Sequence, residues 1–169
     1  AQILQLLQTY DQELSLLPPN KVTVHGDLNP RNIFITPNHV LFIDWTNTTW
    51  DDAFFDLSYF AAILDYDEAE TETLLQAYLG HVPTSTDWHR YDLTYKINLL
   101  GLVMIADLAS ERLAEHTHEV VNDAGDLQEL SYYARRFAES ADMSAQLLHD
   151  WSRAALREVR DHGNRRLHL

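Results

Sequence analysis

Three oxygen-bearing side chains stand at spacings that suit the transfer of a phosphoryl group to a hydroxyl. Asp27 lies within the stretch His25–Asn32, whose last residue is Asn32, and Asp44 follows twelve residues later. A carboxylate on a rigid loop can accept the proton of an attacking hydroxyl, so we predict that Asp27 is a general base. Mg2+ prefers oxygen ligands, so we predict that Asn32 and Asp44 hold it against the phosphates of a nucleotide. We expect His25 to brace the loop through its ring nitrogens.

Short β-type runs on both sides of this loop would position the three side chains. The apolar run Val22–Val24 leads into it, and the runs Ile33–Thr36 and Val40–Ile43 follow it. Pro37 and Asn38 supply the turn between the last two runs, which predicts a β-hairpin. Since the second strand of a hairpin returns to the place where the first began, the residues just before and just after the hairpin should lie close together.

Three segments carry a resemblance to a known family. The stretch His25–Asn32 resembles the His-Gly-Asp-Leu-x-x-x-Asn catalytic loop of the aminoglycoside phosphotransferase and choline kinase-like superfamily, which is related to the protein kinases. The triplet Ile43–Trp45 is similar to the Ile-Asp-Trp/Phe of that superfamily, and Trp50–Leu57 is similar to the segment that leads into its next helix. The motif-bearing match extends from about Val22 to Leu64.

The resemblance implies a fold, an activity and a set of roles. It implies the mostly α (α+β) architecture of the helical C-terminal lobe of a protein-kinase-like fold, with a short catalytic-loop β-hairpin. It assigns Asp27 as catalytic base, Asn32 and Asp44 as magnesium ligands, and Asp56 as a residue that steadies the catalytic loop from behind. The implied cofactors are Mg2+ and ATP or GTP. The implied acceptors are aminoglycosides, choline or ethanolamine.

The chain departs from that superfamily before the catalytic loop. These kinases carry an N-terminal lobe with a glycine-containing loop and a strand lysine that contact the phosphates. Here no two of the five glycines are close together, and Lys21 is the one lysine that precedes the loop. We expect a single C-terminal lobe over residues 1–169, with the loop and hairpin at 22–45 and a helical subdomain at 53–165. Its missing N-terminal lobe would be its partner, and alone it should bind nucleotide weakly and turn over little.

Apolar periodicity predicts that helices make up most of the chain. The first helix should stop before Leu17, and Asp87 is expected to cap the start of a long helix that runs through Leu108. The remaining predictions are helices at 53–64 and 67–79, a polar loop at 46–52, a polar stretch at 115–125, and one long or two consecutive helices from 126 to about 162. Gly80 is expected to cap the C-terminus of the helix at 67–79.

Composition indicates a folded domain with one core. The chain has 169 residues, of which 46% are hydrophobic, and it contains no cysteine. That length suffices for a single good core, and disulfides and thiolate metal sites are excluded. The most apolar stretch, Ile97–Ala109, is interrupted and falls short of membrane-spanning length. We see no signal peptide at the start of the sequence. Because the absence of cysteine is compatible with a reducing cytoplasm, we expect a cytoplasmic protein, and we expect no membrane partner.

Charge favours cationic ligands. The net charge is −14, and between Arg31 and Arg90 there are ten acidic residues and no lysine or arginine. Such a block repels nucleic acid and anionic membranes and attracts cations. We therefore expect no nucleic-acid partner and a small, cationic, hydroxyl-bearing substrate. Solvated helix faces are the alternative explanation for the acidic residues Asp65, Asp67, Glu68, Glu70 and Glu72.

Other readings of the sequence stay open. His116 and His118, beside two glutamates, resemble a metal cluster but fall in an expected loop without a clearly spaced third ligand. Four aromatic residues would suit either a wall for a quaternary ammonium or the core: Trp50, Trp88, Tyr91 and Tyr95. The main alternative to a kinase lobe is a non-catalytic kinase-like module that binds a ligand or a protein.

Overall fold

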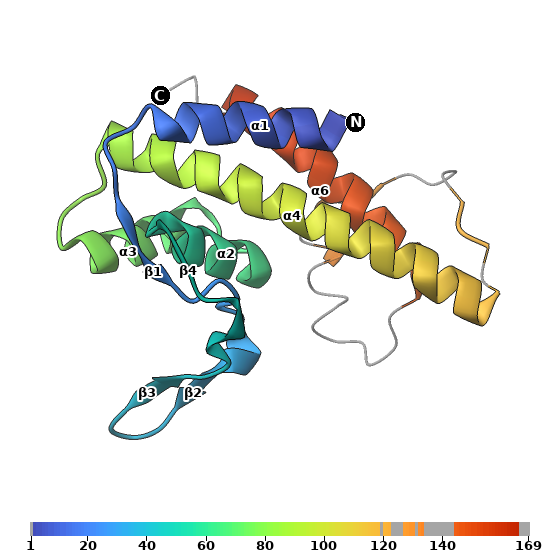
Figure 1. Ribbon diagram of the computed structural model, residues 1–169, viewed down its shortest axis with the longest axis horizontal. Coiled ribbons are helices and arrows are strands. Elements are labelled where there is room, and N and C mark those ends of the chain that lie inside the picture. The colour runs from blue at the N-terminus through green and yellow to red at the C-terminus, as the bar shows by residue number, and fades with distance from the viewer. Residues whose placement is uncertain (1, 119, 123–126, 131, 134–143, 166–169) are drawn as a thin grey trace. The chain divides into compact units, whose positions relative to one another are not determined.

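The fold is mostly helical, with two small two-stranded sheets (Figure 1). The computed structural model describes residues 2–118, 120–122, 127–130, 132–133 and 144–165. The chain divides into two compact units, residues 1–98 and 99–169, and each is described by itself. The first unit holds the predicted catalytic loop, the hairpin and the predicted magnesium ligands.

The first unit opens with a helix and a strand that bring the chain to the catalytic-type loop. Helix α1 (Gln2–Ser15) ends before Leu17, as predicted. Strand β1 (Lys21–Val24) contains the predicted run Val22–Val24 and pairs antiparallel with β4 (Thr49–Asp52), with Val24 opposite Thr49. The prediction of a polar loop at 46–52 is therefore wrong for its second half. The segment is polar, which favours a loop, but pairing with β1 satisfies its backbone hydrogen bonds and makes it a strand.

The predicted β-hairpin is confirmed as a separate sheet (Figure 1). Strands β2 (Ile33–Ile35) and β3 (Val40–Phe42) pair antiparallel, with Ile33 opposite Phe42. The turn between them is closed by hydrogen bonds between Thr36 and His39. Short 3-10 turns flank the hairpin: η1 (Pro30–Asn32) lies before it and η2 (Trp45–Asn47) lies after it.

Two helices follow β4, and their ends are fixed by local chemistry. Helix α2 (Phe54–Leu64) matches the predicted range. Helix α3 (Glu68–Leu79) begins with a capping box, in which the side chain of Asp67 accepts from the Glu70 backbone N–H and the Glu70 side chain accepts from the Asp67 backbone N–H. Gly80, at φ 73°, caps its C-terminus as predicted.

The start of the long helix differs from the prediction. Helix α4 (Ser85–Thr117) begins before Asp87, which lies in its first turn. The Asp87 carboxylate accepts from the Thr84 backbone N–H at 2.8 Å, and the Thr84 hydroxyl accepts from the Asp87 backbone N–H at 3.3 Å. Thr84 is thus the capping residue, and Asp87 is its reciprocal partner. Burial raises the pKa of Asp87, but the hydrogen bonds from Thr84, together with the electrostatic attraction of His81 and Arg90, outweigh it and leave that pKa below its ordinary value.

The core of the first unit joins α2, α3 and the beginning of α4. Its buried cluster consists of Ala53, Phe54, Ala61, Leu75 and Tyr91. Because Phe54 and Ala61 on α2 are both buried in this cluster, the backbone of α2 is fixed by packing. A buried ion pair adds a polar clamp, in which Arg90 on α4 contacts Asp52 at the end of β4. Arg90 also donates to the Pro18 carbonyl oxygen at 2.6 Å, which ties the α1–β1 connection to α4.

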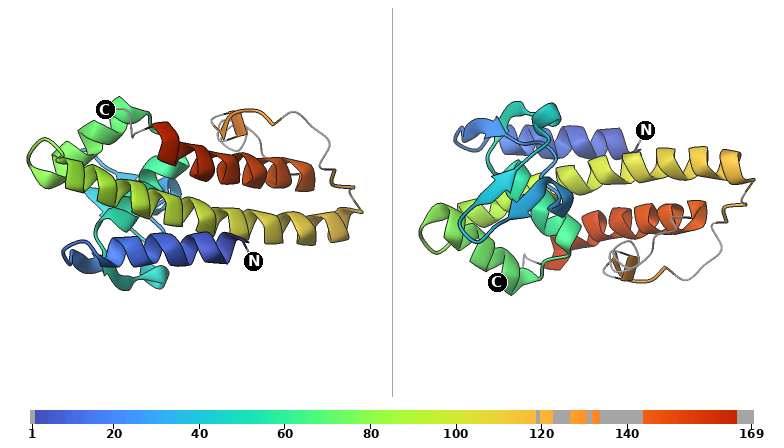
Figure 2. Two further views of the ribbon diagram at one scale, coloured as in Figure 1. Left: turned by 90° about the horizontal axis from the view of Figure 1, so that it is seen from above. Right: turned by 90° about the horizontal axis from the view of Figure 1, so that it is seen from below.

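The second unit consists of the C-terminal part of α4 and α6 (Ala145–Arg165), which lie side by side in every view (Figures 1 and 2). The buried Ser110 hydroxyl donates to the Ala145 carbonyl oxygen at 2.7 Å, and Ser152 contacts Asp107. α6 bears out the last part of the helix predicted from 126 to 162. Of the earlier part, residues 126, 131 and 134–143 lie outside the described residues.

Within the described ranges, α4 is the one helix whose length and composition would allow it to cross a membrane. The prediction that no apolar stretch approaches membrane-spanning length was based on the stretch Ile97–Ala109. The whole helix is longer than that stretch. In the structure 44% of the relevant window is buried among other protein segments. Core helices of soluble proteins meet the same criterion, so this feature is weak evidence for a membrane span.

Candidate active site

The loop between β1 and η1 makes a tight turn at Gly26. Gly26 has a φ of 79°, in the left-handed region that only glycine adopts without strain. A Cβ atom at this position would overlap the backbone carbonyl oxygen of Asn47, in η2. The glycine therefore lets the loop pass directly against the segment that follows the hairpin.

We expect Gly26→Ala to cost about 1–3 kcal/mol of unfolding free energy from backbone strain alone, and more from the overlap with Asn47. Gly80→Ala is the matched control, because Gly80 has a similar φ of 73° and open space where the Cβ would lie. Urea unfolding of both variants separates the two effects. Equal losses in the two variants would contradict the close approach of the loop to Asn47.

Asp56 and His25 hold the backbone of this loop. The Asp56 carboxylate, in the first turn of α2, accepts from the backbone N–H of His25 at 2.6 Å and of Gly26 at 3.0 Å. The buried His25 ring has its Nε2 2.8 Å from the Ile43 carbonyl oxygen, and its Nδ1 accepts from the Asp27 backbone N–H at 3.3 Å. Both ring nitrogens are thus engaged, one with the end of the hairpin and one with the loop.

The carboxylate of Asp27 accepts three side-chain hydrogen bonds. Oδ1 accepts from the Tyr59 hydroxyl at 2.9 Å and from Asn29 Nδ2 at 2.9 Å. Oδ2 accepts from Asn32 Nδ2 at 3.2 Å, and the same amide nitrogen donates to the Asp27 carbonyl oxygen at 2.9 Å. The structure therefore brings Asp27 and Asn32 into direct contact.

A backbone hydrogen bond of the preceding residue, Ile43, brings Asp44 close to Asn32. The Ile43 N–H donates to the Asn32 carbonyl oxygen at 3.0 Å, so the two ends of the hairpin meet as expected. Asp44 adopts a left-handed conformation with φ 61°, and its Oδ1 accepts from the Thr46 hydroxyl at 2.7 Å. In the part of the chain that the structure describes, no hydrogen bond joins the Asp44 side chain to Asp27 or Asn32.

The donor set fits a hard cation. The Asn32 amide nitrogen faces Asp27, so its carbonyl oxygen is directed away from that carboxylate. Asp44 keeps one carboxylate oxygen, Oδ2, beyond the one that Thr46 engages. An amide oxygen and a carboxylate oxygen at the base of one hairpin are ligands of the kind that Mg2+ accepts. The roles of Asn32 and Asp44 as magnesium ligands stay predictions.

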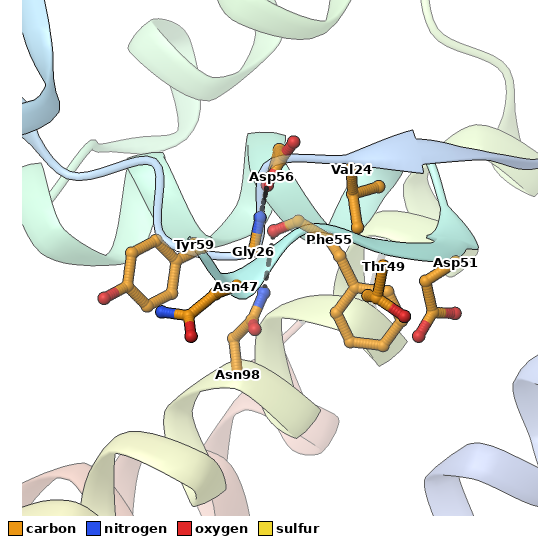
Figure 3. A pocket seen from close by; sticks show the side chains of 9 residues that line it. All are labelled: Val24, Gly26, Asn47, Thr49, Asp51, Phe55, Asp56, Tyr59 and Asn98. Atoms are coloured by element: carbon orange, nitrogen blue, oxygen red, sulfur yellow. Dashed lines mark hydrogen bonds between the residues drawn. The ribbon is translucent and has the colours of Figure 1, made fainter. Parts of the chain in front are cut away.

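A cavity of about 200 Å3 lies beside the loop (Figure 3). The side chains of Asn47, Tyr59 and Asn98 lie toward one side of it, and those of Thr49, Asp51 and Phe55 toward the other. Gly26, Val24 and Asp56 complete its lining. Hydroxyl, amide, carboxylate and aromatic groups thus surround a space that Tyr59 connects to Asp27.

Sequence reasoning did not select Tyr59 and Asn29. Tyr59 lies 32 residues after Asp27, and its position one turn beyond Asp56 on α2 is the only local sign of its contact. Asn29 also caps η1, where its side chain accepts from the Arg31 backbone N–H at 2.9 Å. This capping role is readable from the sequence Asn-Pro, but the contact with Asp27 is not.

The structure gives no support to the two other candidate sites, the aromatic wall and the histidine cluster. Tyr91 is buried in the core, Trp88 and Tyr95 pack against it, and Trp50 is 65% exposed on β4. These four residues therefore do not form one aromatic wall. His116 lies in the last turn of α4, so the expectation of a loop there is wrong. Among the described residues no group of three or more histidines and acidic residues could hold a metal ion.

The fold and the loop together define a kinase-like phosphotransferase class, and comparison with known families agrees. The model of the phosphotransferase enzyme family (APH) matches residues 1–93, which carry the loop, the hairpin and α2. The chain belongs to this family. The resemblance to the aminoglycoside phosphotransferase and choline kinase-like superfamily is thereby confirmed, and so is the mostly α, kinase-like fold.

A solved structure supports the fold. A choline/ethanolamine kinase family protein from Mesorhizobium loti has a TM-score of 0.58 to this chain at 19% sequence identity. The alignment covers 89% of this chain and 50% of that protein, so the chain spans half the length of its structural neighbour. At this identity the likeness concerns the fold alone. No curated protein matches the chain.

Proposed function

We propose that the chain is the C-terminal catalytic lobe of an ATP-dependent phosphotransferase that acts on a hydroxyl group of a small cationic molecule. The single observation that carries this proposal is the contact between Asp27 and Asn32 in a loop whose neighbour across the hairpin base is Asp44. Membership of the phosphotransferase enzyme family supports the reaction class.

In this proposal Asp27 acts as the general base. Its carboxylate is held by Tyr59, Asn29 and Asn32, so it is oriented before a substrate arrives. Such preorganisation lets it accept the hydroxyl proton without a search through rotamers. Asp56 and His25 act on the loop that carries it, and they do not touch the acceptor.

Asn32 and Asp44 would hold Mg2+ with the nucleotide phosphates. When bound, the ion neutralises charge on the phosphates and orients them. Hydrogen bonding within the site serves this role, because Thr46 fixes the carboxylate of Asp44 and Asp27 fixes the amide of Asn32.

A nucleotide-gripping N-terminal lobe would be the partner of this chain. The hairpin and the residue triplet after it expose seven large apolar side chains, at 44–81% of their full area: Phe34, Ile35, Val40, Leu41, Phe42, Ile43 and Trp45. So many exposed apolar side chains on one hairpin are typical of a segment that docks against another part of a protein. Without the lobe that covers it, we expect weak nucleotide binding and little turnover.

The charge of the chain and the lining of the cavity beside the loop both favour a cationic acceptor. Asp51 lines that cavity together with the aromatic rings of Phe55 and Tyr59. Carboxylates and aromatic faces both favour cations. Amino alcohols such as choline and ethanolamine, and aminoglycosides, combine a cationic group with a hydroxyl.

We expect Asp44→Ala to abolish magnesium-dependent binding of ATP, because it removes the carboxylate that the proposal assigns to the ion. Isothermal titration calorimetry of the chain with ATP, with and without Mg2+, measures this loss. Asp67→Ala is the control, since it removes a carboxylate that caps α3. A wild-type affinity for MgATP in Asp44→Ala would remove Asp44 from the site.

The activity itself is tested with labelled ATP and a panel of acceptors, in the chain joined to a nucleotide-binding lobe. We expect transfer to choline, ethanolamine or an aminoglycoside and much less to neutral or anionic hydroxyl compounds. Preference for a neutral or anionic acceptor would contradict the proposed substrate class. Binding of MgATP without transfer to any acceptor would favour the alternative of a non-catalytic kinase-like module.

A further inference from the structure

The two oxygens of the Asp27 carboxylate accept different numbers of side-chain hydrogen bonds. Oδ1 accepts from Tyr59 and from Asn29, whereas Oδ2 accepts from Asn32 alone. Each carboxylate oxygen offers two lone-pair positions. The hydrogen bonds of Oδ1 therefore use both of its positions, and Oδ2 keeps one.

We propose that Tyr59 is a positioning residue, which holds Asp27 so that Oδ2 presents its remaining lone pair to the acceptor hydroxyl. This inference rests on the proposed function of Asp27 as the general base. In the reaction the hydroxyl proton passes to Oδ2, the acceptor oxygen bonds to the γ-phosphorus, and the bond from that phosphorus to the bridging oxygen breaks, with its electrons leaving on ADP. Tyr59 donates its hydrogen bond throughout and gives up no proton.

The geometry of α2 suits Tyr59 to this role. Tyr59 lies three residues after Asp56, so both side chains leave the same face of the helix. Asp56 holds the loop by its backbone N–H groups, and Tyr59 holds it by the Asp27 side chain. One rigid helix thus fixes both the path of the loop and the orientation of its carboxylate.

Neighbouring residues restrain α2 at the level of Tyr59. Asn98 on α4 donates through Nδ2 to the Phe55 carbonyl oxygen at 2.9 Å (Figure 3). The same nitrogen donates to the Ser58 hydroxyl at 2.8 Å. Phe54 and Ala61, on the same helix, are buried in the core. The tyrosine hydroxyl is therefore carried on a backbone that is held from two directions.

The protonation state of Tyr59 supports a constant donor. Burial raises the pKa of this phenol far above its ordinary value, and the hydrogen bond to Asp27 and the charge of Asp27 raise it further. At neutral pH the hydroxyl keeps its proton. Among the described residues, the side-chain acceptor of this proton is Asp27 Oδ1.

The test is Tyr59→Phe, measured by steady-state kinetics in the chain joined to its nucleotide-binding lobe. We expect kcat to fall by about 10- to 100-fold, as for a misplaced reacting group, with the KM values for ATP and acceptor unchanged within about twofold. Tyr78→Phe, which removes the hydroxyl of a half-exposed tyrosine, is the control for loss of a phenol. Tyr59→4-aminophenylalanine retains an N–H donor at the same place and should restore most of kcat.

Each outcome bears on one claim. A wild-type kcat in Tyr59→Phe, or a rise in KM without a fall in kcat, overturns the positioning role. So does a 4-aminophenylalanine variant that folds with the wild-type melting temperature and is as slow as Tyr59→Phe. If Asp27→Asn leaves transfer intact, the proposed function itself fails. If Asp27→Asn abolishes transfer while Tyr59→Phe does not affect it, only the inference about Tyr59 is lost.

Discussion

Asp27→Asn is expected to lower kcat for phosphoryl transfer by about 10^2- to 10^4-fold, the range that general-base catalysis supplies. The amide has nearly the shape of the carboxylate, but it cannot accept a proton from the acceptor hydroxyl. The KM for ATP should change little, because the proposal assigns the magnesium and its phosphates to Asn32 and Asp44. Initial rates with labelled ATP and the preferred amino alcohol measure both quantities.

The same substitution has a structural cost that must be separated from the chemistry. Three donors, from Tyr59, Asn29 and Asn32, face the carboxylate, and an amide NH2 group would face at least one of them. An unsatisfied donor of this kind costs about 1–3 kcal/mol. Asp67→Asn, on α3, controls for the loss of one negative charge. Rates within twofold of wild type in folded Asp27→Asn would exclude Asp27 as the base.

Arg90→Met should destabilise the first unit by about 3–5 kcal/mol, the cost of leaving a buried charge without its partner. The Arg90 and Asp52 side chains are 7% and 6% exposed, so water cannot replace the lost guanidinium. Arg90 also donates to the Pro18 carbonyl oxygen, and that bond would be lost as well. Urea unfolding followed by tryptophan fluorescence gives the free energy of unfolding.

Two further variants show whether the buried charge causes this loss. Lys21→Met breaks the pair between Lys21 and Asp51, which lie 3.9 Å apart with side chains 58% and 40% exposed, and should cost at most about 1 kcal/mol. Adding Asp52→Asn to Arg90→Met removes the orphaned charge while an amide oxygen can still accept from the Phe54 N–H. The double variant should recover part of the stability. A double variant less stable than Arg90→Met would contradict this account.

Features encoded in short stretches of sequence were predictable. The hairpin follows from two β-type runs around Pro37 and Asn38, and its ends meet because its strands are antiparallel. The end of α3 at Gly80 follows from the conformational freedom of glycine. The loop His25–Asn32 could be recognised because its chemistry needs particular residue types at fixed spacing.

Features that depend on distant partners were not predictable in the same way. β4 has a polar sequence, and it forms a strand because its backbone pairs with that of β1. The contact of Tyr59 with Asp27 joins residues 32 positions apart and depends on how α2 packs. The sequence analysis assigned the N-cap of α4 to Asp87, but the cap is Thr84, three residues earlier. Both residue types are good N-caps, and only the geometry shows which one caps the helix.

The central claim is that a divalent cation, held at the base of the hairpin by Asn32 and Asp44, lies next to Asp27. Mn2+ in place of Mg2+ tests it directly, through paramagnetic broadening of backbone amide signals in the NMR spectrum of the labelled chain with ATP. The account predicts that the amides of residues 27, 32 and 43–46 broaden first, while those of α3, with its own acidic residues, broaden later. Broadening that begins on α3 and leaves Asn32 and Asp44 sharp would contradict it.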